Sequence, residues 1–80
     1  MKVWVVEIEE DNNYSYVTGV YFSFKKAKDS VRPMAIETVA DWYCGDISST
    51  NKENIKQMFN TFEKDGRIDG LVRITEFEVG

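Results

Sequence analysis

The side chains that most often perform catalysis are scarce in this chain. It contains no histidine, which excludes Ser-His-Asp and Cys-His triads, histidine acid-base chemistry and zinc sites that need imidazole. Its single cysteine, Cys44, can form neither an internal disulfide nor a multi-cysteine metal site. Cys44 also lies near the expected end of a helix and close to Asp46, where the local field disfavours a thiolate. We therefore expect a structural thiol and no enzymatic activity.

The stretch from Asp65 to Glu76 is similar to a calcium-binding loop. Counted from Asp65, acids stand at loop positions 1, 5 and 12 and a glycine at position 6, close to the EF-hand pattern. Position 3, however, is Arg67, a cation where an oxygen ligand is needed. The second helix of such a site would also have to fit into residues 77–80, which is too short for stability. Two Asp-Gly turns that lead into a strand explain the same residues, so we expect no metal and no cofactor.

Pairs of glutamates two residues apart occur near both ends of the chain, at Glu7 and Glu9 and at Glu76 and Glu78, with Glu10 beside the first pair. Residues two apart on a strand share a face, so the four predict one acidic patch if the terminal strands are neighbours. The sequence shows no enclosing pocket that would make a pair a glycosidase-type acid and base. Two interpretations stay open: a solvated outer sheet face, or an acidic surface that recognises a basic partner.

Four basic residues gather at the expected start of the first helix. They are Lys25, Lys26, Lys28 and Arg32. A solvated helix face explains them, and a contact with phosphate or an acidic partner is the alternative. Positive charge near a helix N-terminus is not intrinsically stabilising, which keeps that alternative open.

Residues 12–22 carry no charge and include three tyrosines. An edge strand is normally protected against pairing by lysine, proline or a bulge, whereas Tyr, Ser, Asn and Gly are residues that binding loops use for contact. Burial beneath helices is one explanation, and strand addition by a partner or a second copy is the other. The candidate partner-binding residues are Glu7, Glu9, Glu10, Tyr14, Tyr16, Tyr21, Glu76 and Glu78.

Three segments are predicted to be strands that position these residues. Residues 2–9 are rich in valine and interleave apolar with charged positions, and residues 14–22 are rich in β-branched and aromatic types. The turn composition of residues 11–13 joins the two as a hairpin. Gly19 marks a bulge or a close contact. After an Asp-Gly turn, residues 71–79 form the last strand.

A first helix is predicted from Ser23, which can cap the free N–H groups of the first turn. Its apolar stripe is expected to include Phe24, Ala27, Val31, Met34 or Ala35, Thr38 and Trp42. Pro33 predicts either a kink or a break into two short helices. Cys44 and Gly45 are expected to end this segment.

A second helix is predicted from Thr50, whose side chain and that of Glu53 have the spacing of a capping box. One face carries Ile55, Met58, Phe59 and Phe62, and the helix is expected to end at Asp65 and Gly66.

These elements predict one α+β domain over residues 1–80. Its three-stranded, mainly antiparallel sheet, in the order β-β-α-α-β, carries two helices on one face. A net charge of −4 argues against direct nucleic-acid binding. The first apolar run, residues 3–6, is too short for a signal peptide or a membrane span. We expect a cytoplasmic protein that does not contact membranes.

Three short stretches, Lys2 to Val6, Gly19 to Lys28 and Ile74 to Val79, resemble a type of small phage- and prophage-encoded protein of mostly unassigned function. Members begin with a Lys-Val-(aromatic)-Val-Val strand, pass through Gly-Val-(aromatic)-(aromatic)-Ser into a Lys/Ala-rich helix, and end on an Ile-x-Glu-(aromatic)-Glu-Val strand. Residues 32–66 look like an insertion beyond the simplest ββαβ form. The resemblance supplies no functional residues.

Size, charge and this resemblance lead to one expectation about function. The protein is predicted to be a small acidic interaction module, encoded by a phage or mobile element, that binds and inhibits a host protein or nucleoprotein, as anti-CRISPR and other anti-defence inhibitors do. In that case it acts in the host cytoplasm. The alternative is a homodimeric structural module that pairs through the uncharged second strand.

Overall fold

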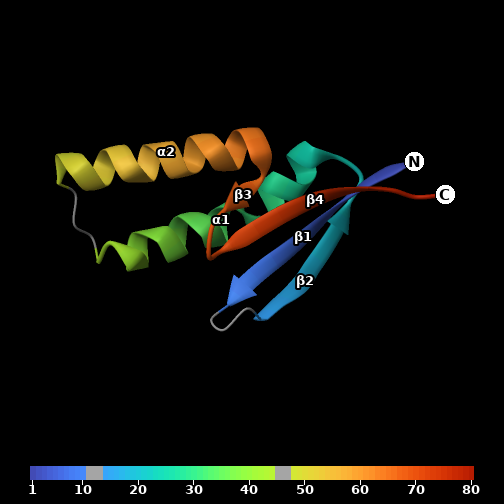
Figure 1. The fold of residues 1–80 in the computed structure, drawn as a ribbon, viewed down its shortest axis with the longest axis horizontal. Coiled ribbons are helices and arrows are strands. Elements are labelled where there is room, and N and C mark those ends of the chain that lie inside the picture. Colours follow the sequence, from blue (N-terminus) through green and yellow to red (C-terminus); the bar gives the residue numbers. More distant parts are fainter. Residues whose placement is uncertain (11–13, 45–47) are drawn as a thin grey trace.

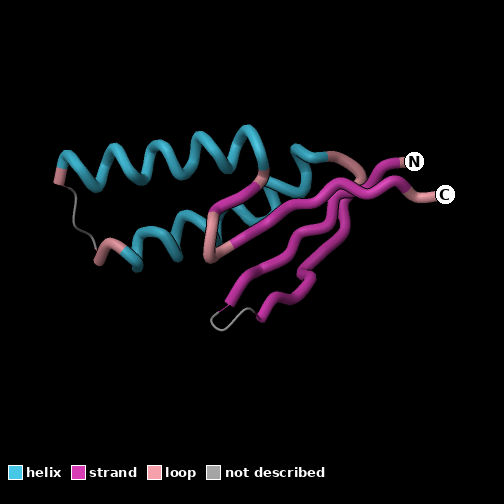
Figure 2. The backbone as a smooth tube through the Cα atoms, in the orientation of Figure 1, coloured by secondary structure: helices cyan, strands magenta, loops and turns pink. Residues whose placement is uncertain are grey.

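The computed structural model describes residues 1–10, 14–44 and 48–80. The elements in chain order are β1 (Lys2–Glu10), β2 (Tyr14–Tyr21), α1 (Phe24–Trp42), α2 (Ser49–Asp65), β3 (Arg67–Ile68) and β4 (Val72–Glu78). The strands form one antiparallel sheet in the order β2-β1-β4-β3. In Figures 1 and 2 helix α1 crosses one face of this sheet, and α2 runs back beside α1. The α+β class is confirmed.

The expected number of strands is wrong, because the sheet has a fourth strand, β3, made of Arg67 and Ile68 alone. Two residues cannot show an alternating pattern, so no periodicity in the sequence indicates this strand. Ile68 pairs with Val72, and the Asp69-Gly70 turn joins β3 to β4. The second Asp-Gly turn therefore closes a short hairpin at the edge of the sheet.

The hydrophobic core lies between the sheet and the helices. β1 and β4 pair so that Val6 faces Ile74 and Ile8 faces Val72, and all four side chains are buried. The helices cover them with the buried residues Ala27, Val31, Ala35, Val39 and Phe62. Of the two predicted alternatives, Ala35 lies in the core and Met34 is half-buried. Val39 is buried in place of the predicted Thr38, which is half-buried, and Trp42 is exposed.

Helix α1 begins as predicted, because the Ser23 side chain accepts a hydrogen bond of 3.1 Å from the backbone N–H of Lys26. Of the two alternatives predicted at Pro33, a kink or a break, the break does not occur, since α1 is continuous from Phe24 to Trp42. A proline at this position removes the bond to the carbonyl of Asp29. Both residues are exposed, so water can hydrate that carbonyl group and the helix continues.

Helix α2 begins before the predicted capping box. Ser48 is the N-cap, and its side chain accepts a bond of 3.3 Å from the backbone N–H of Asn51. Thr50, the predicted cap, lies inside the helix. The end at Asp65 is as predicted: Gly66 takes the left-handed conformation with φ 73°, and its N–H donates to the carbonyl of Phe62.

The two chain ends meet at the far end of the sheet, where the backbone N–H of Val79 donates to the carbonyl of Met1 over 2.7 Å (Figure 1). Within the part of the chain that the structure describes, neither helix is long and apolar enough to cross a membrane. The predicted turn at residues 11–13 and the predicted helix-terminal Gly45 lie outside the described residues.

Candidate protein-binding surface

β2 is an edge strand that the helices leave largely open. Six of its eight residues are exposed and none is buried; only Gly19 and Tyr21 are half-buried. Burial beneath the helices, one of the two explanations for its uncharged composition, is therefore wrong. Figure 2 shows β2 as the outermost strand, with β1 between it and β4.

The hydrogen-bonding pattern identifies the backbone groups on the open edge. The odd-numbered residues of β1 bond to β4. Two hydrogen bonds show this, one from Glu9 N–H to the Leu71 carbonyl and one from Val79 N–H to the Met1 carbonyl. Residues of an antiparallel strand alternate between their two neighbours, so the even-numbered residues of β1 bond to β2. Their partners include Tyr14 and Tyr16. Ser15, Val17 and Val20 consequently direct their N–H and C=O groups away from the sheet.

The strand is irregular at Thr18. The pairing with β1 shifts between Val6 and Glu7, which face Gly19 and Val17 respectively, so Thr18 is an extra residue. A Cβ atom on Gly19 would lie 2.7 Å from both Cε2 and Oη of Tyr21, whose ring therefore covers the glycine. Gly19 thus marks both a bulge and a close contact, the two features that its position in a strand suggested.

The three candidate tyrosines lie on the face of the sheet that carries the helices, because they pair with Glu10, Ile8 and Trp4 of β1. The rings of Tyr14 and Tyr16 have centroids 6.2 Å apart, and both side chains are exposed. Tyr21 packs against the core cluster. Tyr14 and Tyr16 are therefore available to a partner, whereas Tyr21 is mainly structural.

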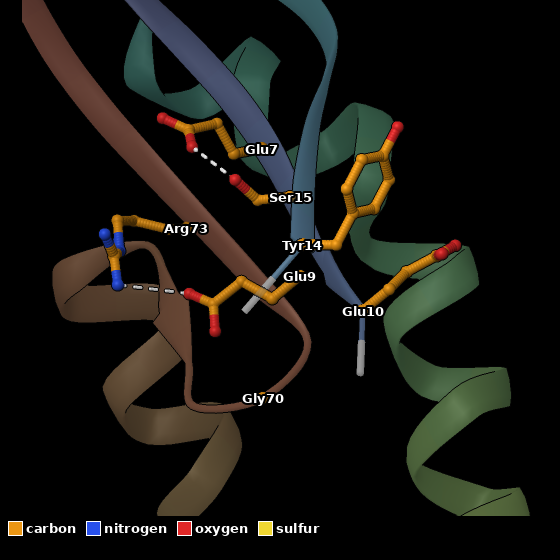
Figure 3. A pocket seen from close by; sticks show the side chains of 7 residues that line it. All are labelled: Glu7, Glu9, Glu10, Tyr14, Ser15, Gly70 and Arg73. Carbon is orange, nitrogen blue, oxygen red and sulfur yellow. Dashed lines mark hydrogen bonds and ion pairs between the residues drawn. The ribbon is translucent and has the colours of Figure 1, made fainter. Parts of the chain in front are cut away.

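Figure 3 shows that the candidate glutamates of β1 divide between the two faces of the sheet. Glu7 and Glu9 lie on the outer face, where Glu7 accepts a bond of 3.4 Å from Ser15 and Glu9 forms an ion pair of 3.2 Å with Arg73. Glu10 lies beside Tyr14 on the opposite face, toward α1. The residues drawn in Figure 3 line a pocket, and because Arg73 neutralises Glu9, this pocket is less acidic than its three glutamates suggest.

The expectation of a single acidic patch is wrong. Although β1 and β4 are neighbours, their register places Glu7 opposite Arg73, whereas Glu76 and Glu78 lie opposite Trp4 and Lys2 at the other end of the sheet. Glu76 is 3.5 Å from Lys2 Nζ, and Glu78 is 3.2 Å from the terminal amine. The two pairs also lie on opposite faces, because position 73 is an odd number of residues from 76. Glu76 and Glu78 therefore do not belong to the surface around β2.

Three of the four basic residues at the start of α1 are engaged within the protein, and the ammonium group of the fourth, Lys26, forms no ion pair among the described residues. Lys25 and Arg32 both bond to Asp29, and Arg32 and Lys28 reach Glu63 of α2 at 2.7 and 3.6 Å. Hydrogen bonds from Arg32 and then Lys25 lower the pKa of Asp29 from 3.8 to about 2, and bonds to Asp29 and then Glu63 raise the pKa of Arg32. This network links α1 to α2. A structural role therefore explains these basic residues without a phosphate or an acidic partner.

The outer face of the sheet carries apolar residues that sequence reasoning missed as surface features. Val5 pairs with Val20 on one side and Thr75 on the other, and Val3 pairs with Phe77. Val20 is 58% exposed and Phe77 is 49% exposed. The sequence does place two valines, Val3 and Val5, at odd-numbered positions of β1. The same pattern is, however, equally typical of a strand that is buried on both faces, so it did not identify an exposed apolar surface.

The remaining chemical candidates are Cys44 and the residues of the calcium-like stretch. Cys44 is exposed at the end of α1, with its Sγ 3.5 Å from the carbonyl of Asp41. Asp65 to Glu76 form the end of α2, β3, a turn and the start of β4 rather than a loop around an ion. Across the described ranges, no group of three or more His, Cys, Asp and Glu side chains could hold a metal.

Comparisons with protein-family models, with curated proteins and with solved structures gave no match for this chain.

Proposed function

We propose that the protein is a small protein-interaction module that binds its partner through the open edge of β2. The observation that carries the proposal is an exposed edge strand without a charged residue or a proline. Most natural edges carry such residues because unpaired backbone groups invite another strand. The outward N–H and C=O groups of Ser15, Val17 and Val20 can pair with a strand of the partner, as in β-strand addition.

The bulge at Thr18 limits how that partner binds. Bulges disturb the ladder and increase the local twist. The regular stretches on either side are short, Tyr14 to Val17 and Gly19 to Tyr21. A partner strand is therefore expected to pair with one stretch and to gain further affinity from side chains that contact Tyr14, Tyr16 or the valines of the outer face.

The proposal has a finer form: a phage or mobile element encodes the protein, which acts in the host cytoplasm by binding and inhibiting a host protein or nucleoprotein. Its support is the resemblance of the two terminal strands and the strand-to-helix junction to small phage-encoded proteins, together with the size and the net charge of −4. The acidic balance favours contact with protein surfaces rather than with nucleic acid.

Capture of a partner with a matched pair of variants tests the proposal. Val17→Lys places a charge on the edge strand, where lysine prevents pairing, and Glu7 opposite Val17 should accommodate the new cation. Ile36→Lys, at a residue of α1 that is 53% exposed, is the control. Affinity purification from a host lysate should recover a stoichiometric protein that Val17→Lys loses and Ile36→Lys keeps. If all three proteins recover the same partner, or none does, the proposal is wrong.

A homodimer through β2 is the second candidate, and the same uncharged edge favours it. Two copies of β2 can pair antiparallel without placing like charges opposite each other, because none of its residues is charged. Sedimentation equilibrium at several concentrations tests this candidate. A dimer that dissociates on dilution and is absent from the Val17→Lys variant supports it, and a monomer at every concentration excludes it.

A further inference from the structure

A groove runs along the face of the sheet that carries the helices, between α1 and the open part of β1 and β2. Two adjoining pockets of about 510 and 310 Å³ form it, and they share Ile8, Tyr16 and Met34. Thr38 and Trp42 extend the helix side of the first pocket. The volumes fall in the range of about 300 to 1,000 Å³ in which proteins enclose small ligands or the side chains of a peptide. The groove can therefore accept at least one large apolar side chain.

Both rims of this groove are acidic. On the strand side the acidic rim is Glu10; Glu9 also borders the groove, but its carboxylate lies on the outer face of the sheet and pairs with Arg73. On the helix side, Glu37 and Asp41 stand three and seven residues after Met34, so they lie next to the row of Met34 and Thr38 on the surface of α1. Glu37 and Asp41 are exposed, and the described residues include no cation paired with them or with Glu10. No lysine or arginine lines either pocket.

We infer that this groove binds a segment of another protein in which an apolar or aromatic side chain is flanked by lysine or arginine. The apolar side chain would pack between Tyr16, Met34 and Trp42, and the basic groups would lie between the two acidic rims, where opposite charges favour binding and speed association. The inference rests on the proposed function, since it gives the chemistry of the partner that an interaction module would bind. The inference differs from the proposed function in the surface that binds the partner, which is the groove rather than the edge of β2.

The basic cluster of α1 in a second copy, Lys25, Lys28 and Arg32, does not provide this segment. Within each molecule Lys25 and Arg32 are paired with Asp29, and Lys28 with Glu63. To enter the groove of a second copy these cations would have to leave their own partners, which cancels much of the gain. The acidic rims also repel the phosphates of nucleic acid. Two copies that each carry a net charge of −4 also repel one another, so a different protein with free basic residues is the occupant that the charges favour.

The probe is a fluorescein-labelled synthetic peptide in which leucine and lysine alternate, and a peptide with glutamate in place of lysine is its control. The double variant Glu10→Lys/Asp41→Lys reverses one charge on each rim. Glu53→Lys/Asp65→Lys changes the net charge equally at exposed positions of α2 away from the groove. Fluorescence anisotropy measures the affinity at low and high salt, and circular dichroism verifies that every variant is folded.

Binding of the lysine peptide should weaken about tenfold or more in the rim variant and by less than about threefold in the α2 variant. High salt should weaken it as well, because exposed charges are screened. In a Trp4→Phe background, where Trp42 is the only tryptophan, the peptide should shift the emission of Trp42 to shorter wavelength. The glutamate peptide should not bind.

Four results would overturn the inference. The first is that the lysine peptide does not bind, and the second is an equal loss in both double variants, which would mean only general attraction to an acidic protein. The third is a loss in Val17→Lys with none in the rim variant, which would place binding at the edge of β2 and leave the proposed function intact. The fourth is a dimer whose groove is filled by the second copy. The converse result is that the lysine peptide binds the Val17→Lys variant as well as it binds the wild type. That result would support this inference even if no partner is captured through the edge of β2.

Discussion

At the scale of single residues, Asp29 has the most perturbed environment among the described carboxylates. Its pKa is held at about 2, below its ordinary value of 3.8, first by the bond from Arg32 and then by that from Lys25. A carboxylate with a lowered pKa stabilises the folded state above its unfolded pKa, and the contribution is lost as the pH falls through the folded pKa. The stabilisation by Asp29 is therefore complete above about pH 4 and lost near pH 2.

The variant Asp29→Asn measures this contribution. Urea unfolding of the wild type and of the variant, between about pH 5 and about pH 2, should show a difference in the free energy of unfolding that narrows below about pH 4. Other carboxylates that titrate in this range are present in both proteins and cancel in the difference. A difference that stays constant over the whole range would contradict the assignment.

Gly66 and Gly70 provide a matched comparison of backbone conformation and packing. Both have left-handed φ angles, 73° and 79°. A Cβ atom at Gly66 would lie 2.7 Å from Cε1 of Phe24 and 3.0 Å from Cβ of Ile74, whereas at Gly70 nothing lies within 4 Å. Gly70→Ala should cost about 1 kcal/mol for the conformation alone, and Gly66→Ala about 1 to 3 kcal/mol more because α1 and β4 must move apart.

Urea denaturation of both alanine variants gives the comparison directly. The carbonyl of Gly66 also accepts a bond of 2.8 Å from Ile74 N–H, so displacement of this residue should loosen the junction of α2 and β4. Equal losses of stability in the two variants would show that the close packing around Gly66 relaxes at no cost.

At the scale of elements, the start of α2 separates two capping hypotheses. Ser48 accepts the bond from Asn51 N–H, and Thr50 lies within the first turn. Loss of an N-cap side chain typically costs about 1 kcal/mol. Ser48→Ala should therefore lower the free energy of unfolding by about 1 kcal/mol, and Thr50→Ala by a few tenths at most. The reverse order in urea denaturation would restore the capping box at Thr50 and Glu53.

Elements with local signals were predictable from the sequence. Ser23 caps the start of α1 with its side chain and Gly66 ends α2 with a left-handed backbone, and both preferences belong to the residue type itself. The α+β fold class followed from the spacing of the apolar residues. The start of α2 was not predictable, because Ser48, Ser49 and Thr50 can all cap a helix and tertiary contacts choose among them. β3 was missed because its two residues become a strand only by pairing with β4.

The candidate site depended on register, which single-strand patterns do not specify. The faces of Glu7 and Glu9 could be inferred from alternation, but only the pairing of β1 with β4 places Arg73 opposite Glu7 and moves Glu76 to the other end of the sheet. The groove likewise needs α1 to be placed across the sheet. The sequence identified the uncharged strand and its tyrosines correctly as unusual, while their exposure depended on where the helices pack.

At the scale of the whole molecule, the fold is elongated, with extents of 48 × 26 × 16 Å. The helices project beyond the sheet at the end where α1 finishes and α2 begins (Figure 1). Phe62, in the last turns of α2, is the only buried residue of that helix, while Ile55, six residues after its start, is half-buried. Stability within a domain follows the density of buried contacts, so the projecting ends should open before the sheet does.

Amide hydrogen exchange measures this difference. The N–H groups of residues 53–56 should exchange at least about tenfold faster than those of residues 60–63 in the same helix, once corrected for intrinsic rates. The amides of Val6 and Ile8, in the central strand β1, should be the slowest, because their side chains are fully or almost fully buried. Equal protection along α2 would show that the helices open only with the whole domain. Graded protection would mean that local opening reaches the Trp42 end of the groove while the β2 edge stays folded, so that the two surfaces can be occupied independently.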